Sequence, residues 1–244
     1  MKLKNKLSKR EWIFVGIIAL LVIALAVGTL LMPKQKAETE TKEKSYYDIK
    51  CESYAVQNTN LAKEQIVFIG DSITDFYVLD DYYADLPLAV YNRGISGDTT
   101  EGVLKRLDVS VIDLKPSKVV LMIGTNDVNL KRENEDILYT YRQIVNKIRI
   151  ELPDTELYCM SIIPQGKGLE DYSTVDVDLS TEKILYLNAE IEKITEEKGA
   201  VYIDLFSHIA DENNYLIGEY SDDALHLNAA GFEVWTALLK PYLQ

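Results

Sequence analysis

A serine in this chain follows directly on an apolar run that is typical of a buried strand. Ser72 comes after IVFIGD, residues 66–71, where Gly70 allows a tight turn. A serine hydroxyl becomes a nucleophile for acyl transfer when an imidazole takes its proton. On local grounds a capping role is favoured, because Gly-Asp-Ser is common turn and cap chemistry. A catalytic role for Ser72 therefore depends on partners elsewhere in the chain.

The chain has two histidines that could serve as the base. His226 lies three residues after Asp223 in SDDALHLNAAG, a spacing that places both side chains on one side of a helical turn. The carboxylate can then fix the imidazole tautomer and stabilise its charged form. His208, in DLFSHIADE, has no acid arranged in this way. An acidic loop followed by Asn228 as a helix cap is the simpler interpretation, and it is compatible with the catalytic one.

Acyl transfer also needs hydrogen-bond donors for the oxyanion that develops on the substrate. Gly97, in NRGISGDTT, brings a bare backbone N–H to the start of an expected helix. Asn126, in IGTNDV, can direct a side-chain amide into the same region. Each stretch alone is also a plausible turn.

The elements that position these residues alternate between strand and helix. The strands are expected at nearly continuous apolar runs, as in parallel sheets buried on both faces: residues 66–70, 88–92, 118–124, 156–163 and 200–205. Helical patterns are expected between and after them: residues 99–112, 134–152, 180–199 and 228–243. The fold class is therefore α/β, with an open parallel sheet covered by helices on both faces. Ligands of such sheets bind at the carboxyl ends of the strands, where the candidate residues lie.

Four motifs taken together resemble the conserved blocks of SGNH (GDSL-type) hydrolases. They are GDSIT at 70–74, GISGDTT at 94–100, GTND at 124–127 and DALH at 223–226, in the family's order, over roughly residues 64–244. The resemblance implies a flavodoxin-like three-layer α/β/α sandwich with about five parallel strands. It also implies that Ser72 is the nucleophile, His226 the general base and Asp223 its orienting acid, with an oxyanion hole made by the Ser72 and Gly97 N–H groups and the Asn126 side chain.

The departures from the family pattern do not touch reacting groups. Ile73 stands where the family name has leucine, and Leu227 stands where many members have proline. The rival α/β-hydrolase elbow, G-x-S-x-G, is excluded because Thr74 replaces its second glycine. Asp71 is expected to have a structural role at an exposed strand end, where it would hydrogen-bond the turn. The implied reaction requires no metal or organic cofactor.

The sequence predicts a carboxylic ester hydrolase and favours short-chain, O-acetyl esters of a carbohydrate or cell-envelope glycan. Tyr77, Tyr82 and Tyr83 follow the nucleophile, and aromatic rings with polar tips suit sugars; the alternative is that they pack a helix against the sheet. Residues 164–180 form a long connection that is either a lid or an ordered rim. A lysophospholipase or thioesterase, an acyltransferase and a catalytically silent tethered binding module stay open as alternatives.

The first residues predict a membrane anchor. Residues 13–32 are twenty uncharged, almost wholly apolar residues, enough to span a bilayer, and a lysine-rich segment precedes them. A cleaved signal peptide is disfavoured, because its apolar region is usually shorter and ends at small residues. The expected organisation is a cytoplasmic basic segment (1–12), a transmembrane signal anchor (13–32), a flexible linker (33–44) and an extracellular hydrolase domain (45–244), in a single-pass protein of the cell membrane.

The charge balance and the cysteines exclude several classes of function. Residues 1–36 hold seven Lys or Arg and one Glu, so the rest of the chain carries a formal charge of −19 and should repel nucleic acid. Cys51 and Cys159 lack metal-ligand spacing, and whether they pair is left open. The expected partners are an ester substrate and the membrane around the anchor, with no obligate protein partner.

Overall fold

The computed structural model describes residues 44–171 and 173–244. The predicted basic segment, the transmembrane helix and all of the linker except Lys44 lie outside these residues. Within the described ranges, none of the helices combines the length and the apolar character needed to cross a membrane.

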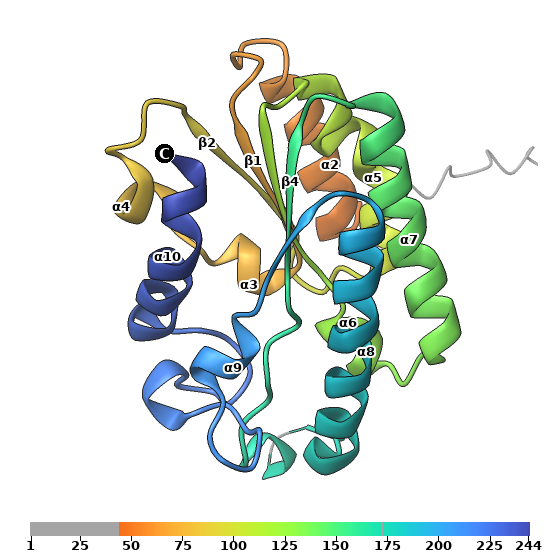
Figure 1. Ribbon diagram of the computed structural model, residues 1–244, viewed down its shortest axis with the longest axis vertical. Helices are drawn as coiled ribbons and strands as arrows, with labels where there is room; N and C mark the ends of the chain where they lie inside the picture. Colours follow the sequence, from red (N-terminus) through yellow and green to blue (C-terminus); the bar gives the residue numbers. More distant parts are fainter. Residues whose placement is uncertain (1–43, 172) are drawn as a thin grey trace, which may run out of the picture. The chain divides into compact units, whose positions relative to one another are not determined.

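Five parallel strands form a single sheet with the order β2-β1-β3-β4-β5 (Figure 1). The strands are β1 (Ile66–Gly70), β2 (Val90–Gly94), β3 (Lys118–Met122), β4 (Glu156–Met160) and β5 (Val201–Ile203). The predicted parallel sheet is confirmed, and its order is that of flavodoxin-like sheets. β2 begins two residues later than predicted because Leu88 packs on the core from outside the strand, while the polar Asn92 and Arg93 lie within it.

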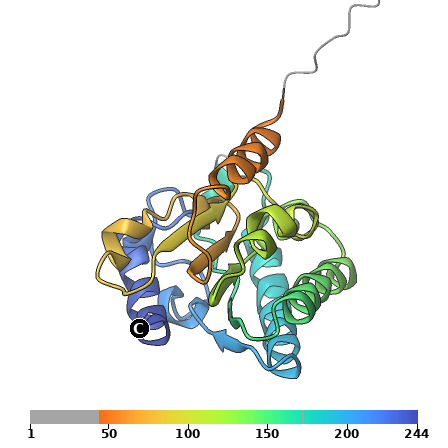
Figure 2. The same cartoon turned by 90° about the horizontal axis from the view of Figure 1, so that it is seen from above.

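Helices cover both faces of the sheet, as predicted (Figures 1 and 2). α5, α7 and α8 lie on one face, and α10, α4 and α9 lie on the other. The bounds of the α-helices are α2 (Tyr46–Gln57), α3 (Ser72–Asp75), α4 (Leu79–Tyr83), α5 (Thr100–Ser110), α6 (Thr125–Asn129), α7 (Asn134–Glu151), α8 (Val177–Glu197), α9 (Phe206–Ile209) and α10 (Ala229–Leu243). Three 3₁₀ turns are η1 (Ile112–Leu114), η2 (Leu169–Asp171) and η3 (Gly218–Tyr220).

Two helix starts differ from the prediction because other residues act as caps. α5 starts at Thr100, one residue after the expected start, because Thr99 is its cap and accepts the N–H of Gly102. Asp176 caps α8, so this helix starts at Val177 instead of near Ser180. The predicted loop 164–180 is correspondingly shorter, and it contains η2.

The strands bury alternate residues against the two helical layers. Val67, Ile69, Val119 and Leu121 face α5, α7 and α8, whereas their sequence neighbours face α10. A parallel sheet covered on both faces buries consecutive positions of its inner strands, which explains why β1, β3 and β4 are nearly continuous apolar runs. Cys51 and Cys159 are both free thiols, and Cys159 is buried in β4 as expected.

Two of the three tyrosines that follow Ser72 are buried in the core, and the third packs against it. Tyr77 and Tyr83 are each 1% exposed, and the Tyr77 ring stacks on Phe232 with the centroids 4.4 Å apart. Tyr82 is half-buried against the same cluster. Of the two interpretations left open for these tyrosines, Tyr77 and Tyr83 follow the packing one, and the hydroxyl of Tyr77 bonds inside the protein to Tyr83 and Thr236.

Candidate active site

Three strands end at the same level on the edge where the candidate residues lie. Gly70 of β1 is in register with Gly94 of β2 and with Met122 of β3. The segments that carry Ser72, Gly97 and Asn126 therefore leave the sheet side by side. The strand order reverses between β1 and β3, and ligands bind at such switch points in α/β sheets.

Ser72 is the first residue of the short helix α3, and Asp71 is its cap. Asp71 Oδ1 accepts the N–H of Ile73 at 3.0 Å. The local interpretation of Ser72 as a cap is therefore wrong, and its hydroxyl is free for another partner. Ser72 Oγ lies 2.9 Å from His226 Nε2.

His226 also contacts Asp223, through its other ring nitrogen. Nδ1 lies 2.6 Å from Asp223 Oδ2, and Asp223 Oδ1 accepts the backbone N–H groups of His226 and Leu225 at 2.7 and 3.0 Å. Burial raises the pKa of Asp223, but the hydrogen bonds from the His226 side chain and backbone outweigh it and lower the pKa overall. An ionised Asp223 favours the tautomer with the proton on Nδ1, which leaves Nε2 able to accept the proton of Ser72.

The Asp223 and His226 pair lies in a loop before α10, not on the helical turn that the spacing predicted. Asp223 folds its own loop through the two backbone hydrogen bonds, which bring residue i+3 to the carboxylate without a helix. Asn228 caps α10 by accepting the N–H of Gly231, as predicted.

The two further oxyanion candidates are linked to each other. Gly97 has φ +80° within a turn closed by the hydrogen bond from Asp98 N–H to the carbonyl of Ile95 at 3.1 Å. Asn126 Nδ2 donates to the carbonyl of Asp98 at 2.8 Å. An amide nitrogen carries two N–H groups, so one stays available to a ligand. His208, in contrast, lies exposed on α9 with Nδ1 against the carbonyl of Asp204.

The model of the GDSL-like lipase/acylhydrolase family matches residues 68–234. The chain belongs to this family. The SGNH resemblance of its motifs is thereby confirmed.

Individual relatives of this GDSL-family chain agree with that assignment. Human platelet-activating factor acetylhydrolase IB subunit alpha2 is 30% identical over 105 residues, which is 42% of this chain and 45% of that protein. A solved structure from Streptococcus pneumonia, described as a platelet activating factor, is 27% identical with a TM-score of 0.75, covering 82% of this chain and 93% of that one. A GDSL-like lipase from Bacteroides thetaiotaomicron is 24% identical, has a TM-score of 0.70 and covers 82% and 98%; it shows the fold alone.

Asp71 of the acylhydrolase is buried, not exposed as expected. Its side chain is 1% accessible, and Oδ2 has no hydrogen-bond partner among the described residues. Burial raises the pKa of Asp71 to about 7, against the lowering effect of the hydrogen bond from Ile73 N–H; the charges of Asp98 and Asp127 raise it further. The predicted structural role in the turn is confirmed by the Ile73 hydrogen bond.

Replacing Asp71 by asparagine should change how stability depends on pH. The folded-state pKa of about 7 lies above the ordinary value of 3.8, so the folded acylhydrolase holds this proton more tightly and loses stability as the pH rises across that window. The asparagine of Asp71→Asn cannot ionise. As the pH rises, the unfolding free energy of this variant should therefore increase relative to that of the wild type by up to ~1.4 kcal/mol per pH unit. Urea unfolding at about pH 4.5 and about pH 7 measures this, with the exposed Asp113→Asn as control. An equal difference at both pH values contradicts the interpretation.

Two residues of this GDSL-family site escaped the sequence analysis. Phe76 is 51% exposed, and its ring centroid lies 5.0 Å from that of His226. Asp75 contacts the turn that carries Gly97 through Ser96. The sequence signal for both residues is their position three and four places after Ser72. The sequence does not distinguish the exposed Phe76 from the buried Tyr77 beside it.

Proposed function

We propose that this chain is a serine esterase that hydrolyses short-chain acyl esters through an acyl-enzyme. The observation that carries the proposal is the continuous contact from Ser72 Oγ to His226 Nε2 at 2.9 Å and from His226 Nδ1 to Asp223 Oδ2 at 2.6 Å. Hydrolysis of an ester by a serine nucleophile requires this arrangement, in which the nucleophile contacts a base and the base contacts an orienting acid.

The reaction proceeds in two halves. Ser72 Oγ attacks the ester carbonyl while His226 Nε2 takes its proton, and the oxyanion accepts hydrogen bonds from the Ser72 and Gly97 N–H groups and the Asn126 amide. The carbon–oxygen bond to the alcohol then breaks as His226 protonates the leaving oxygen. A water molecule, deprotonated by His226, attacks the acyl-serine, and the released acid leaves Ser72 protonated again. Every step uses side chains and backbone groups of this chain.

An O-acetyl ester of a carbohydrate or cell-envelope glycan is the substrate that we favour. The curated relatives are named acetylhydrolases, which supports a short acyl group. His226 protonates the departing alcohol, so the alcohol lies beside His226 and the exposed ring of Phe76. A flat aromatic face suits the apolar face of a sugar ring. Phe76, and not the buried Tyr77 or Tyr83, is therefore the aromatic side chain that we propose to contact the sugar.

An acyl-length series separates this proposal from the lysophospholipase and thioesterase alternatives. With aryl esters of increasing chain length, kcat/KM should be highest for acetyl and fall with length. A rate that rises with acyl length favours a long-chain hydrolase instead. A transferase would pass the acyl group to an added sugar in place of water, and how well the site excludes water decides between the two acceptors. The release of less free acid at the same consumption of substrate identifies this transfer.

The location of the enzyme is proposed from its sequence. The apolar stretch 13–32 and the basic residues before it support a single-pass anchor with the N-terminus in the cytoplasm and the catalytic unit outside. Protease added to intact cells should then digest the catalytic unit. Its full protection contradicts this orientation.

Covalent labelling tests whether Ser72 is an activated nucleophile. A fluorophosphonate probe should modify Ser72, and the rate of labelling should fall by at least about 100-fold in His226→Ala, because the probe requires general-base activation of the hydroxyl. His208→Ala is the matched control and should label at the wild-type rate. No labelling of the folded wild type points to the silent binding module, and labelling unaffected by His226→Ala contradicts the assigned base.

A further inference from the structure

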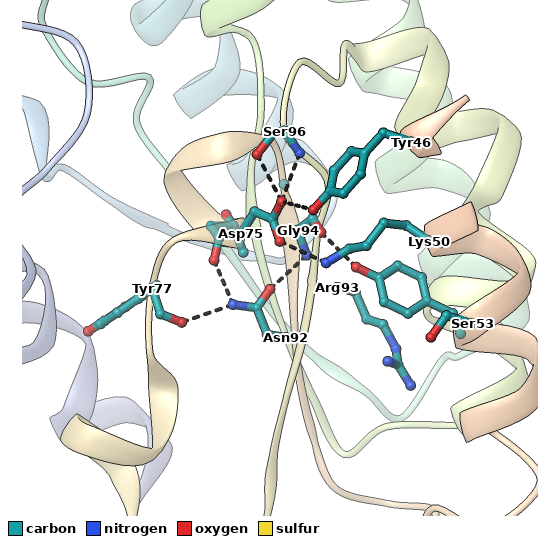
Figure 3. Close-up of polar contacts among 12 residues, drawn as sticks. Tyr46, Lys50, Ser53, Asp75, Tyr77, Asn92, Arg93, Gly94 and Ser96 are labelled. Carbon is teal, nitrogen blue, oxygen red and sulfur yellow. Dashed lines mark hydrogen bonds and ion pairs between the residues drawn. The ribbon is translucent and has the colours of Figure 1, made fainter. Parts of the chain in front are cut away.

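Helix α2 precedes the region matched by the family model and contacts the active-site segments from outside it. Tyr46 Oη donates to Asp75 Oδ2, and Lys50 Nζ contacts Asp75 Oδ1, both at 2.8 Å (Figure 3). One turn further along α2, Tyr54 Oη donates to the carbonyl of Gly94 at 2.6 Å. These contacts fall on the last residue of α3 and on the last residue of β2.

Asp75 connects α2 with the turn that carries Gly97. Its Oδ2 accepts both the backbone N–H of Ser96 at 3.1 Å and the hydroxyl of Ser96 at 2.8 Å (Figure 3). Burial raises the pKa of Asp75, but the hydrogen bonds from Lys50, Ser96 and Tyr46 outweigh it and lower the pKa overall. The carboxylate is therefore charged at neutral pH and accepts four donors in a partly buried position.

The Ser96–Gly97 peptide is the part of the turn whose orientation is not fixed by the sheet. Ser96 and Gly97 are the two central residues of the turn from Ile95 to Asp98. Of these two, only Gly97 has a positive φ, so the turn is of type II. Types I and II differ by a flip of the central peptide, which reverses the direction of the Gly97 N–H. Asp75 accepts hydrogen bonds from the N–H and the hydroxyl of Ser96, and these bonds fix the residue on the N-terminal side of the Ser96–Gly97 peptide.

The junction between α3 and β2 is too tight to absorb a shift of Asp75. A Cβ atom on Gly94 would lie 2.2 Å from the backbone nitrogen of Asp75, so the two segments are in direct contact. The Asn92 side chain donates to the carbonyls of Thr74 and Tyr77 at 2.6 and 2.9 Å and accepts the N–H of Gly94 at 2.8 Å (Figure 3). A displaced Asp75 would therefore move the turn with it.

We infer that Asp75 is a positioning residue that aims the Gly97 N–H at the oxyanion, and that Lys50 and Tyr46 of α2 hold its carboxylate in place. The inference rests on the proposed function, in which Gly97 is an oxyanion donor. It makes α2 a component of the active site, although this helix lies before the family-matched residues 68–234. Asp75 itself does not touch the reacting atoms.

The test compares Asp75→Asn and the milder Lys50→Met with Lys44→Ala in the whole chain of residues 1–244. Lys44 precedes α2 and forms an exposed ion pair with Glu52 of that helix without contacting Asp75, so Lys44→Ala controls for the loss of an ion pair of α2. We expect Asp75→Asn to lower kcat on an aryl acetate by roughly 10- to 100-fold with KM within about twofold, because a misdirected oxyanion donor weakens binding of the transition state only. Lys50→Met should show a smaller loss of the same kind, and Lys44→Ala none.

Binding of phenylboronic acid separates positioning from a general loss of structure. Boronic acids form a tetrahedral adduct with a nucleophilic serine, so their affinity should fall by the same factor as kcat in Asp75→Asn and Lys50→Met. An unchanged kcat in both folded variants, or a loss confined to KM, overturns the inference. If Asp75→Asn does not fold, Lys50→Met alone decides. Failure of the proposed function is distinguishable, because in that case Ser72→Ala would retain activity.

Discussion

Ser72→Ala is expected to lower kcat for a short-chain aryl ester by about 10⁴- to 10⁶-fold, the range found when the nucleophile of a serine hydrolase is removed. The reason is that the acyl-enzyme cannot form without Oγ, which lies 2.9 Å from His226 Nε2. The residual rate reflects the oxyanion donors and substrate binding, which alanine leaves in place. Steady-state rates on the aryl ester with a thermal-unfolding measurement of each variant check this prediction.

The chain offers a matched control for this experiment. Ser207 lies beside His208, with Oγ and Nδ1 3.4 Å apart, and is the other serine adjacent to a histidine side chain in the described residues. Ser207→Ala should retain the wild-type rate, because His208 has no carboxylate contact comparable to that of His226. A Ser72→Ala variant that folds and keeps more than about a tenth of the wild-type rate contradicts the nucleophile assignment.

Asp223→Asn should have the second-largest effect, a fall in kcat of about 10⁴-fold with little change in KM. Asparagine keeps the shape of aspartate and the acceptor for the His226 backbone N–H. Its amide N–H₂, however, would face Nδ1, which favours the tautomer with the proton on Nε2. Nε2 then points an N–H at Ser72 and cannot take the hydroxyl proton. Single-turnover measurement of acylation isolates this step.

Asp222→Asn is the control for Asp223→Asn. Asp222 is the neighbouring acid, and its carboxylate accepts a 3.3 Å hydrogen bond from Asn228 Nδ2 without contacting the imidazole. Its variant should stay within about twofold of the wild-type rate. A loss below about tenfold in a folded Asp223→Asn, or equal losses in both variants, speaks against Asp223 as the group that orients His226.

The parts of the structure that could be predicted from sequence are those with long buried runs or fixed motifs. The strands were recognisable because a doubly covered parallel sheet buries consecutive residues. The four motifs placed Ser72, Gly97 and Asn126 just after β1, β2 and β3, whose ends the strand register brings together, and the Asp223–His226 pair on the loop before α10. Their roles in catalysis stay a proposal until the variants are measured.

Other features had no readable signal. α2 buries only Tyr54 and exposes Tyr46, Ile49 and Val56, so it lacks the apolar periodicity by which long helices are recognised. α3, α4, α6 and α9 are four or five residues long, too short to show a period. The direction of an aromatic side chain is also not set by composition: Tyr77 points into the core, whereas its neighbour Phe76 faces solvent beside His226.

The separation of 154 positions between Ser72 and His226 also matters for how this protein is made. During synthesis the segment with the serine leaves the ribosome long before the loop that carries the imidazole, and domains fold as their chain emerges. The hydroxyl of Ser72 is an ordinary alcohol until α10 and the loop before it pack beside β1. Under the proposed mechanism, the nascent chain does not react with esters, and a measured turnover counts only the molecules in which α10 and the loop before it have packed against the sheet.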